Sequence, residues 1–197
     1  MNNNYLIVAE NIGYKINENK LFHNLSFGVN SGEGLHIKGG NGSGKSTLLR
    51  IILGITTPTK GLIKRCSEDL KISYLGHKNA IKNYLTPIEN LELLFNDVEI
   101  KIAYEWLYKF NLSHVQDELA ASLSFGQQKK LALIRVLAQS PELIVLDEPF
   151  VGLDQTAADQ LNHFLEEQLS EGVGLIFTSH INPKISCKVL DLEAKNV

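Results

Sequence analysis

Gly39-Gly40-Asn41-Gly42-Ser43-Gly44-Lys45-Ser46-Thr47 is the stretch that decides the fold of this chain. It has the pattern G-x-x-x-x-G-K-[ST], in which glycines allow a tight turn and a lysine and a hydroxyl follow. Residues 35–38 before it have the composition of a short strand, and apolar residues recur at helical spacing after it until Gly54. A strand, a glycine-rich turn and a helix in this order predict an α/β fold.

The same nine residues predict a binding site for a nucleoside triphosphate. The backbone N–H groups of such a loop, and the N-terminus of the helix after it, direct partial positive charge at an anion. We expect Lys45 to reach the β- and γ-phosphates and the Ser46 hydroxyl to bind Mg²⁺. The spacing leaves open whether Thr47 contacts another phosphate. The alternative, a turn that binds nothing, is disfavoured by the strand and the helix on either side.

Composition narrows the range of partners. A chain of 197 residues forms one large domain or a core with a subdomain. The net charge of −3 gives no support for a nucleic-acid partner. The two cysteines, Cys66 and Cys187, lie far apart in the sequence, and we expect both to be reduced thiols. No run of eighteen apolar residues occurs, so any membrane part of a complex must come from another chain.

Apolar periodicity, turn residues and capping boxes predict the other elements. Strands are expected at 5–8, 21–29, 62–64, 71–75, 143–146, 174–179 and 188–192, and the first of them suggest an antiparallel sheet. The region from 84 to 139 is expected to be nearly all helix, with capping boxes that start helices at Thr86 and Ser124. Trp106 and Tyr108 in this region are expected in the subdomain core or on a partner surface rather than in a cofactor site. Upstream, Tyr14 either stacks on a nucleotide base or covers a strand edge.

A second chemical stretch follows the helical region. In Leu143-Ile144-Val145-Leu146-Asp147-Glu148-Pro149, four apolar residues suit a strand buried on both faces of a parallel sheet. The two carboxylates then lie at the strand's carboxyl end, where such sheets bind ligands. We expect Asp147 to hold Mg²⁺, directly or through water, and Glu148 to act as a general base toward water.

Three further positions have both a structural and a functional interpretation. The capping box of Ser124 and Gln127 explains a helix start, and with Gly126 it also offers a hydroxyl and an N–H to an anion. Asp154 caps the next helix in one interpretation and belongs to the nucleotide site in the other. His180 lies at the end of a buried strand, from which its side chain can reach a γ-phosphate.

The order of these stretches resembles, over nearly the whole chain, the ATP-binding cassette of ABC transporters. The resemblance rests on Tyr14, the loop at 39–47, L-S-F-G-Q-Q at 123–128, L-I-V-L-D-E-P at 143–149, G-L-D at 152–154 and His180. It implies a phosphate-loop NTPase with a RecA-like core sheet, an antiparallel β subdomain and an inserted α-helical subdomain. These would form one ATP-binding domain over residues 1–197, with the helical subdomain at about residues 84–139. It also implies that the chain binds ATP with Mg²⁺ and hydrolyses the ATP.

The resemblance further implies partners. In that family two cassettes close head to tail around two ATP molecules, so a homodimer is expected. Ser124, Gly126 and Gln127 of one copy would then complete the site of the other, and separate membrane subunits would receive the motion. This places the chain at the cytoplasmic face of a bacterial inner membrane as a peripheral subunit.

A narrower resemblance concerns residues 74–91. Tyr74-Leu75-Gly76-His77, then Ile81-Lys82, Leu85-Thr86 and Glu89-Asn90-Leu91, are similar to the haem exporter ATP-binding subunits of cytochrome c maturation. One departure concerns the position near His77, where most cassettes have a glutamine that touches Mg²⁺ or water. Here His77 is followed by Lys78, and a histidine is a poorer partner for Mg²⁺ than a carbonyl oxygen. This puts the coupling to the membrane subunits, or the turnover rate, in doubt.

Three alternatives stay open on the sequence alone. The cassette could serve another cargo, such as a lipid or a peptide, because cargo contacts lie on the partner chain. A soluble cassette acting on ribosomes or DNA is disfavoured by the acidic net charge. A nucleotide-binding module without catalysis is disfavoured by the presence of Glu148 and His180.

Overall fold

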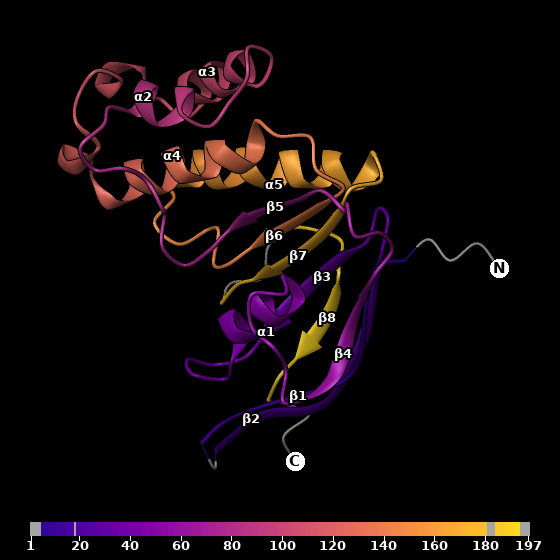
Figure 1. Cartoon of the computed structure of the whole chain (residues 1–197). Coiled ribbons are helices and arrows are strands. Elements are labelled where there is room, and N and C mark those ends of the chain that lie inside the picture. The colour runs from indigo at the N-terminus through magenta and orange to yellow at the C-terminus, as the bar shows by residue number, and fades with distance from the viewer. Residues whose placement is uncertain (1–4, 18, 181–183, 194–197) are drawn as a thin grey trace.

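Two β-sheets and a group of helices make up the structure, a computed structural model that describes residues 5–17, 19–180 and 184–193 (Figure 1). The first sheet is antiparallel, has the strand order β2-β1-β4, and consists of β1 (Tyr5–Ile16), β2 (Asn19–Asn30) and β4 (Lys60–Arg65). The expected strands at 5–8 and 21–29 are therefore confirmed as one long hairpin. The strand at 62–64 is also confirmed, and it pairs with β1 although more than forty residues lie between the two strands in the sequence.

The second sheet is parallel and has the order β5-β6-β7-β3-β8. Its strands are β3 (Gly34–Lys38), β5 (Ile72–Leu75), β6 (Leu143–Leu146), β7 (Gly174–Thr178) and β8 (Lys188–Asp191). Each coincides with an expected strand to within one or two residues. Because parallel strands point the same way, the residues that follow β3, β6 and β7 all emerge at one edge of this sheet.

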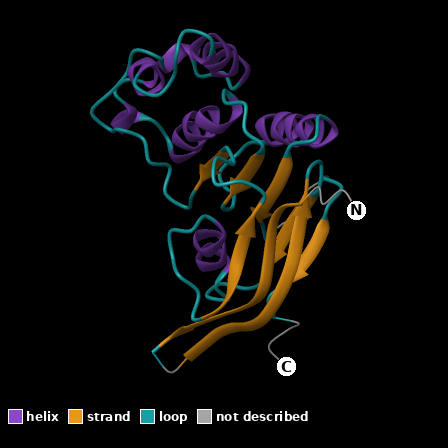
Figure 2. Cartoon of the chain, turned by 45° about the vertical axis from the view of Figure 1, so that its right-hand side comes forward, coloured by secondary structure: helices purple, strands orange, loops and turns teal. Residues whose placement is uncertain are grey.

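Helices cover the parallel sheet on both faces, as the alternation within β6 shows. Ile144 and Leu146 face a core formed with α4 (Phe125–Leu137) and α5 (Gln155–Ser170), whereas Leu143 and Val145 face α1 (Lys45–Ile52) and the antiparallel sheet. Figure 2 shows α1 apart from the other helices, against the strands. The four apolar residues in a row are thus explained by burial on both sides.

The helical region contains α2 (Pro87–Glu92), α3 (Glu99–Lys109), two 3₁₀ turns (Ser113–Val115 and Ala120–Ser122) and α4. Both expected capping boxes are present, at Thr86 with Glu89 and at Ser124 with Gln127. Residues 84–139 are all described and contain no strand, although loops occupy more of this region than the sequence suggested. Short helices and long connections are stable here because tertiary packing, rather than helix propensity, holds them.

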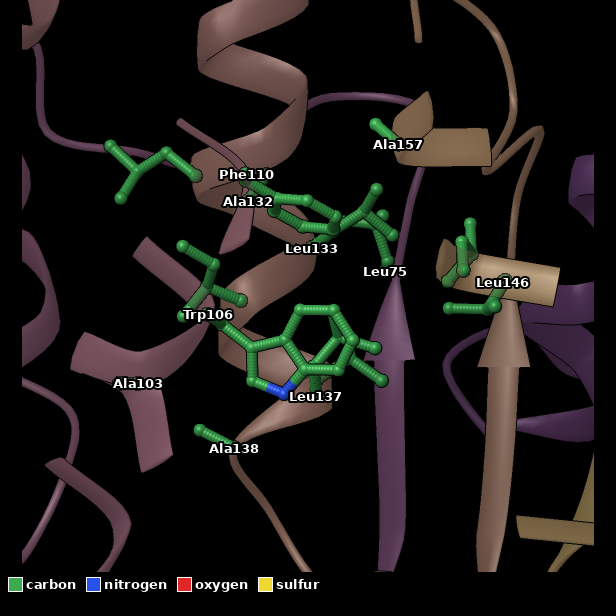
Figure 3. Close-up of a cluster of buried hydrophobic side chains, with 14 of the residues drawn as sticks. Leu75, Ala103, Trp106, Phe110, Ala132, Leu133, Leu137, Ala138, Leu146 and Ala157 are labelled. Atoms are coloured by element: carbon green, nitrogen blue, oxygen red, sulfur yellow. The ribbon is translucent and has the colours of Figure 1, made fainter. Parts of the chain in front are cut away.

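The core of this region forms around the only tryptophan of the chain. Trp106 is 7% exposed and packs against Phe110 and, edge to face, against Phe164, with ring centroids 5.2 and 5.5 Å away. Figure 3 shows its ring among side chains of α4, including Leu133 and Leu137. Tyr108, in contrast, is 78% exposed. The expected place in the core is therefore confirmed for Trp106, whereas Tyr108 is a surface residue.

Candidate functional site

A cavity of about 380 Å³ lies at the edge of the parallel sheet where β3 and β6 end. It is lined by Ile16, Leu21, Gly40, Asn41, Gly42, Gly44, Lys45, Ser46, Thr47, His77, Asp147, Glu148 and His180. The structure thus brings most of the glycine-rich loop together with both carboxylates and the histidine, although about a hundred residues separate the loop from Asp147 in the sequence. Gly39 and Ser43, the other two residues of the loop, do not line this cavity.

The loop has the geometry of an anion site. Gly44 precedes α1 with a φ of 96°, and no side chain of the described residues caps the helix. The hydroxyl of Ser43 is buried without a hydrogen-bond partner in the described part of the chain. The N–H of Gly40 donates to the carboxylate of Glu193 at 2.6 Å, so one loop N–H already binds an anionic group. An uncapped helix start and an orphaned hydroxyl fit a phosphate ligand, which supplies acceptors for both.

The side chain of Lys45 holds the loop closed by hydrogen bonds to the loop backbone. Its ammonium donates to the carbonyl oxygens of Gly39 and Gly40 at 2.7 and 3.2 Å. The side chain is 8% exposed and also lies 3.8 Å from Oε1 of Glu148. A nearly buried ammonium is costly unless it is paired, so this lysine is positioned to meet further negative charge entering the cavity.

The Asp147 carboxylate is buried, with 1% exposure, at the end of β6. The hydroxyl of Thr178, at the end of β7, donates to its Oδ1 at 2.8 Å. The same hydroxyl oxygen accepts the backbone N–H of Glu148 at 2.9 Å. Thr178 therefore fixes the two acidic residues relative to each other, and it is itself fully buried.

Glu148 occupies a strained backbone position, with a φ of 49°. Non-glycine residues rarely adopt this region, and strain of this kind is typical of functional sites. Its Oε2 accepts the backbone N–H of His180 at 3.3 Å, and its Oε1 lies 3.3 Å from Nε2 of His180. Oε1 is buried and receives no hydrogen bond from the described residues. The His180 ring and Lys45 lie near this oxygen, but neither has the geometry of a hydrogen bond to it. Glu148 thus keeps, beside the cavity, an acceptor that no described residue uses.

Ser46 and Asp147 are the expected Mg²⁺ ligands, and both line this cavity. The described residues contain no group of three or more His, Cys, Asp or Glu side chains that could hold a metal ion on their own. This donor set fits Mg²⁺, which usually keeps several water molecules and binds through one or two protein oxygens together with substrate phosphates.

Besides Gly39 and Ser43, five of the expected binding residues do not line the cavity. Tyr14 lines a neighbouring hollow and stacks on Phe22, with 6.3 Å between the ring centroids. The ring of Phe22 in turn lies so close to Gly44 that a Cβ there would approach it to 2.9 Å. Tyr14 is thus connected to the phosphate loop through Phe22.

The other four are Ser124, Gly126, Gln127 and Asp154, at the starts of α4 and α5. Ser124 and Gln127 satisfy each other as a capping box. Asp154 caps α5 through the N–H of Ala157 and forms an ion pair with Lys130, and the hydrogen bond from Lys130 lowers the pKa of the Asp154 carboxyl. Within one copy of the chain these residues stabilise two helix starts.

Sequence reasoning missed Thr178 and two buried bases near the carboxylates. Lys129 of α4 is 3% exposed; burial lowers the pKa of its ammonium, and the charges of Asp147 and Glu148 act in the opposite direction. His36 of β3 is 2% exposed and its Nε2 lies 3.0 Å from the Ser179 carbonyl oxygen. The sequence signal that could have identified these residues was a polar residue within an otherwise apolar, buried strand or helix face.

The structure has four features that together define an ATP-binding cassette. They are a phosphate loop between β3 and α1, an acidic pair at the end of β6, a histidine after β7 and an antiparallel side sheet. The sequence model of the family described as ABC transporter matches residues 22–151. The chain belongs to this family, as an ATP-binding subunit with ATPase activity.

Individual relatives agree with this assignment. The chain is 35% identical to the cytochrome c biogenesis ATP-binding export protein CcmA of Idiomarina loihiensis over 189 residues, which cover 90% of this chain and 87% of the relative. It is 34% identical to CcmA of Escherichia coli K12 over 172 residues, which cover 83% of each.

Solved structures show the same fold. A dimeric structure of a bacterial ABC transporter cassette superposes with a TM-score of 0.79 at 26% identity and covers 94% of both chains. A dimeric cassette in a post-hydrolysis state, bound to ADP and Pi, has a TM-score of 0.76 at 26% identity and covers 89% of this chain and 88% of that chain. Among the described residues, no helix is both long and apolar enough to cross a bilayer.

Proposed function

We propose that this chain is the ATP-hydrolysing subunit of an exporter that serves c-type cytochrome biogenesis, with haem as the cargo, and that Glu148 is its general base. The observation that carries the catalytic part is the meeting of Lys45, Glu148 and His180 at one cavity, with Glu148 within 4 Å of both bases. The cargo rests on the CcmA relatives, which are named for cytochrome c biogenesis and export.

Each residue has a distinct task in hydrolysis. The loop N–H groups and Lys45 bind the β- and γ-phosphates and offset their charge. Glu148 accepts a proton from the attacking water, and we assign this to Oε1, the carboxylate oxygen that receives no hydrogen bond from the described residues. His180 holds the same carboxylate through its backbone N–H and is within reach of the γ-phosphate from the end of β7. Ser46 and Asp147 would hold Mg²⁺, which when bound neutralises developing negative charge on the phosphate oxygens.

A second copy of the chain completes the site in this proposal. Ser124, Gly126 and Gln127 lie outside the cavity of their own copy, and the two related cassettes described above are dimers. Phe125 beside them is 61% exposed, as expected for a surface that another chain covers. We assign the whole chain to a single ATP-binding domain at the cytoplasmic face of the inner membrane. Its helical subdomain, at about residues 84–139, passes the motion to separate membrane subunits.

Glu148→Gln tests the catalytic proposal. The amide keeps the shape of the side chain but cannot accept a proton, so we expect steady-state ATP hydrolysis to fall by about 10²–10⁴-fold. ATP affinity, measured by equilibrium titration, should change by less than about threefold because the phosphate contacts stay in place. The exposed Glu105→Gln is the matched control and should leave the rate unchanged. Wild-type turnover in the Glu148 variant would remove this residue from the mechanism.

Lys45→Ala tests the binding part in the same titration. Loss of its ammonium should abolish tight ATP binding, whereas the exposed Lys101→Ala should not affect it. Equal affinities of the two variants would show that the ammonium does not contact the phosphates.

The cargo requires a test in the source cell. A chromosomal Glu148→Gln allele should remove covalently bound haem from c-type cytochromes, as seen by haem staining of denaturing gels, while non-covalent haem proteins persist. Normal c-type cytochromes in a strain whose purified variant lacks ATPase activity would favour the alternative, a cassette for another cargo such as a lipid or a peptide.

A further inference from the structure

His36 is a polar side chain in the centre of the parallel sheet, and no role above accounts for it. It lies in β3 between Leu35 and Ile37, which face the core with α1. The imidazole points to the opposite face of the sheet, where its ring stacks on Phe177 with centroids 4.7 Å apart and an interplanar angle of 8°. With 2% exposure it is buried, so its ring nitrogens must find partners inside the protein.

The partner of Nε2 is a carbonyl of the peptide that joins Ser179 to His180. Nε2 lies 3.0 Å from the Ser179 oxygen. A carbonyl oxygen can only accept, so this contact requires that Nε2 carries the hydrogen. Burial lowers the pKa of His36, which favours the neutral ring with its single hydrogen. The observed contact assigns that hydrogen to Nε2.

The other end of the same peptide contacts the carboxylate of Glu148. The N–H of His180 donates to Oε2 of Glu148 at 3.3 Å. Ser179 and its peptide come directly after β7 at the catalytic edge of the sheet. A peptide is planar, so a bond that fixes its carbonyl also fixes the direction of its N–H. The ring of His36, the 179–180 peptide and the Glu148 carboxylate therefore form one chain of hydrogen bonds.

This arrangement differs from the contacts described for the loop. Lys45 and the His180 ring approach Oε1 of Glu148, the oxygen assigned to the attacking water. The peptide N–H instead binds Oε2 and sets the rotation of the carboxylate, which determines where Oε1 points. His36 does not line the cavity, and its side-chain hydrogen bond leads to Glu148 through this peptide.

We propose that His36 is a positioning residue for Glu148, acting through the Ser179–His180 peptide. The inference rests on the proposed role of Glu148 as general base. In this proposal β3, the strand that leads into the phosphate loop, also helps to orient Glu148, the group that activates water. The ring does this from the interior of the sheet, where the stack on Phe177 restricts its rotation.

A pair of nearly isosteric substitutions tests the proposal in the full chain. In His36→Gln the side-chain amide can still donate to the Ser179 carbonyl, whereas in His36→Met it cannot. Both lose the stacked ring and have similar length, so a merely structural role would affect both equally. We expect kcat to fall about tenfold in His36→Met, with KM for ATP unchanged, and to stay within about threefold of wild type in His36→Gln.

Equal kcat in the two variants, or a loss that appears in KM rather than in kcat, would overturn the proposal. Wild-type protein without ATPase activity, or a Glu148→Gln variant as active as wild type, would instead refute the proposed function and this role with it. If the variants do not fold, a measurement on the wild-type protein still tests the proposal. Nitrogen NMR of labelled histidine should show His36 as the neutral Nε2–H tautomer at pH 7, and an Nδ1–H tautomer would overturn the proposal.

Discussion

Thr178→Val isolates the hydroxyl that links the two acidic residues of the site. Valine has the shape of threonine, so the fully buried position stays filled and no cavity forms. The substitution removes the donor to Asp147 Oδ1 and the acceptor of the Glu148 N–H, which the wild-type structure places at 2.8 and 2.9 Å. Each buried group left without a partner costs about 1–3 kcal/mol. Because two such groups are left, we expect the free energy of unfolding to fall by about 2–6 kcal/mol.

Thr178→Ser is the matched control, because it keeps the hydroxyl and loses one buried methyl group, worth about 1 kcal/mol. Urea unfolding followed by circular dichroism at neutral pH, without nucleotide, gives both values if the m-value stays constant. In the same variants the Mg²⁺-dependent part of ATP affinity should fall for valine and persist for serine, since Asp147 loses the donor that orients it. If the valine variant is as stable as the serine variant, the hydroxyl does not hold the two carboxylates, and the account of this edge of the sheet is wrong.

Three further expectations concern the loop, the buried histidine and the helical region. In urea unfolding, Gly44→Ala should destabilise the chain more than Gly42→Ala. Both positions have a positive φ, but only at Gly44 would a Cβ approach another side chain, the Phe22 ring at 2.9 Å. Equal losses of stability would show that the Phe22 ring moves aside. Because burial lowers the pKa of His36, the unfolded chain binds a proton first as the pH falls below about 6.5. The wild type should therefore lose stability relative to His36→Gln from pH 7 toward pH 5, with no divergence above pH 7; parallel pH profiles would contradict this. Trp106→Ala should cost about 3–5 kcal/mol by circular dichroism, because the ring is 7% exposed among aromatic neighbours, and a loss below about 1 kcal/mol would place the ring outside the core.

Local signals in the sequence were sufficient for most elements. The two capping boxes at Thr86 and Ser124 start helices where expected, because a cap depends on residues three positions apart. The loop at 39–47 likewise has its conformation encoded by glycines, three of which have positive φ. Less predictable were the loops within residues 84–139, where packing around Trp106 stabilises short helices that would not persist alone.

By itself, then, the sequence determined the α/β class, the phosphate loop and the identity of the residues that bear charge, since each of these depends on neighbours within a few positions. Only the tertiary structure decided which of them meet. The parallel order β5-β6-β7-β3-β8 puts the ends of β6 and β7 beside the loop that follows β3, which places Glu148 3.8 Å from Lys45. Thr178 and His36 gained their roles in the same way, because strand register, set by burial of both faces of the sheet, brings their polar atoms to the carboxylates and to the 179–180 peptide.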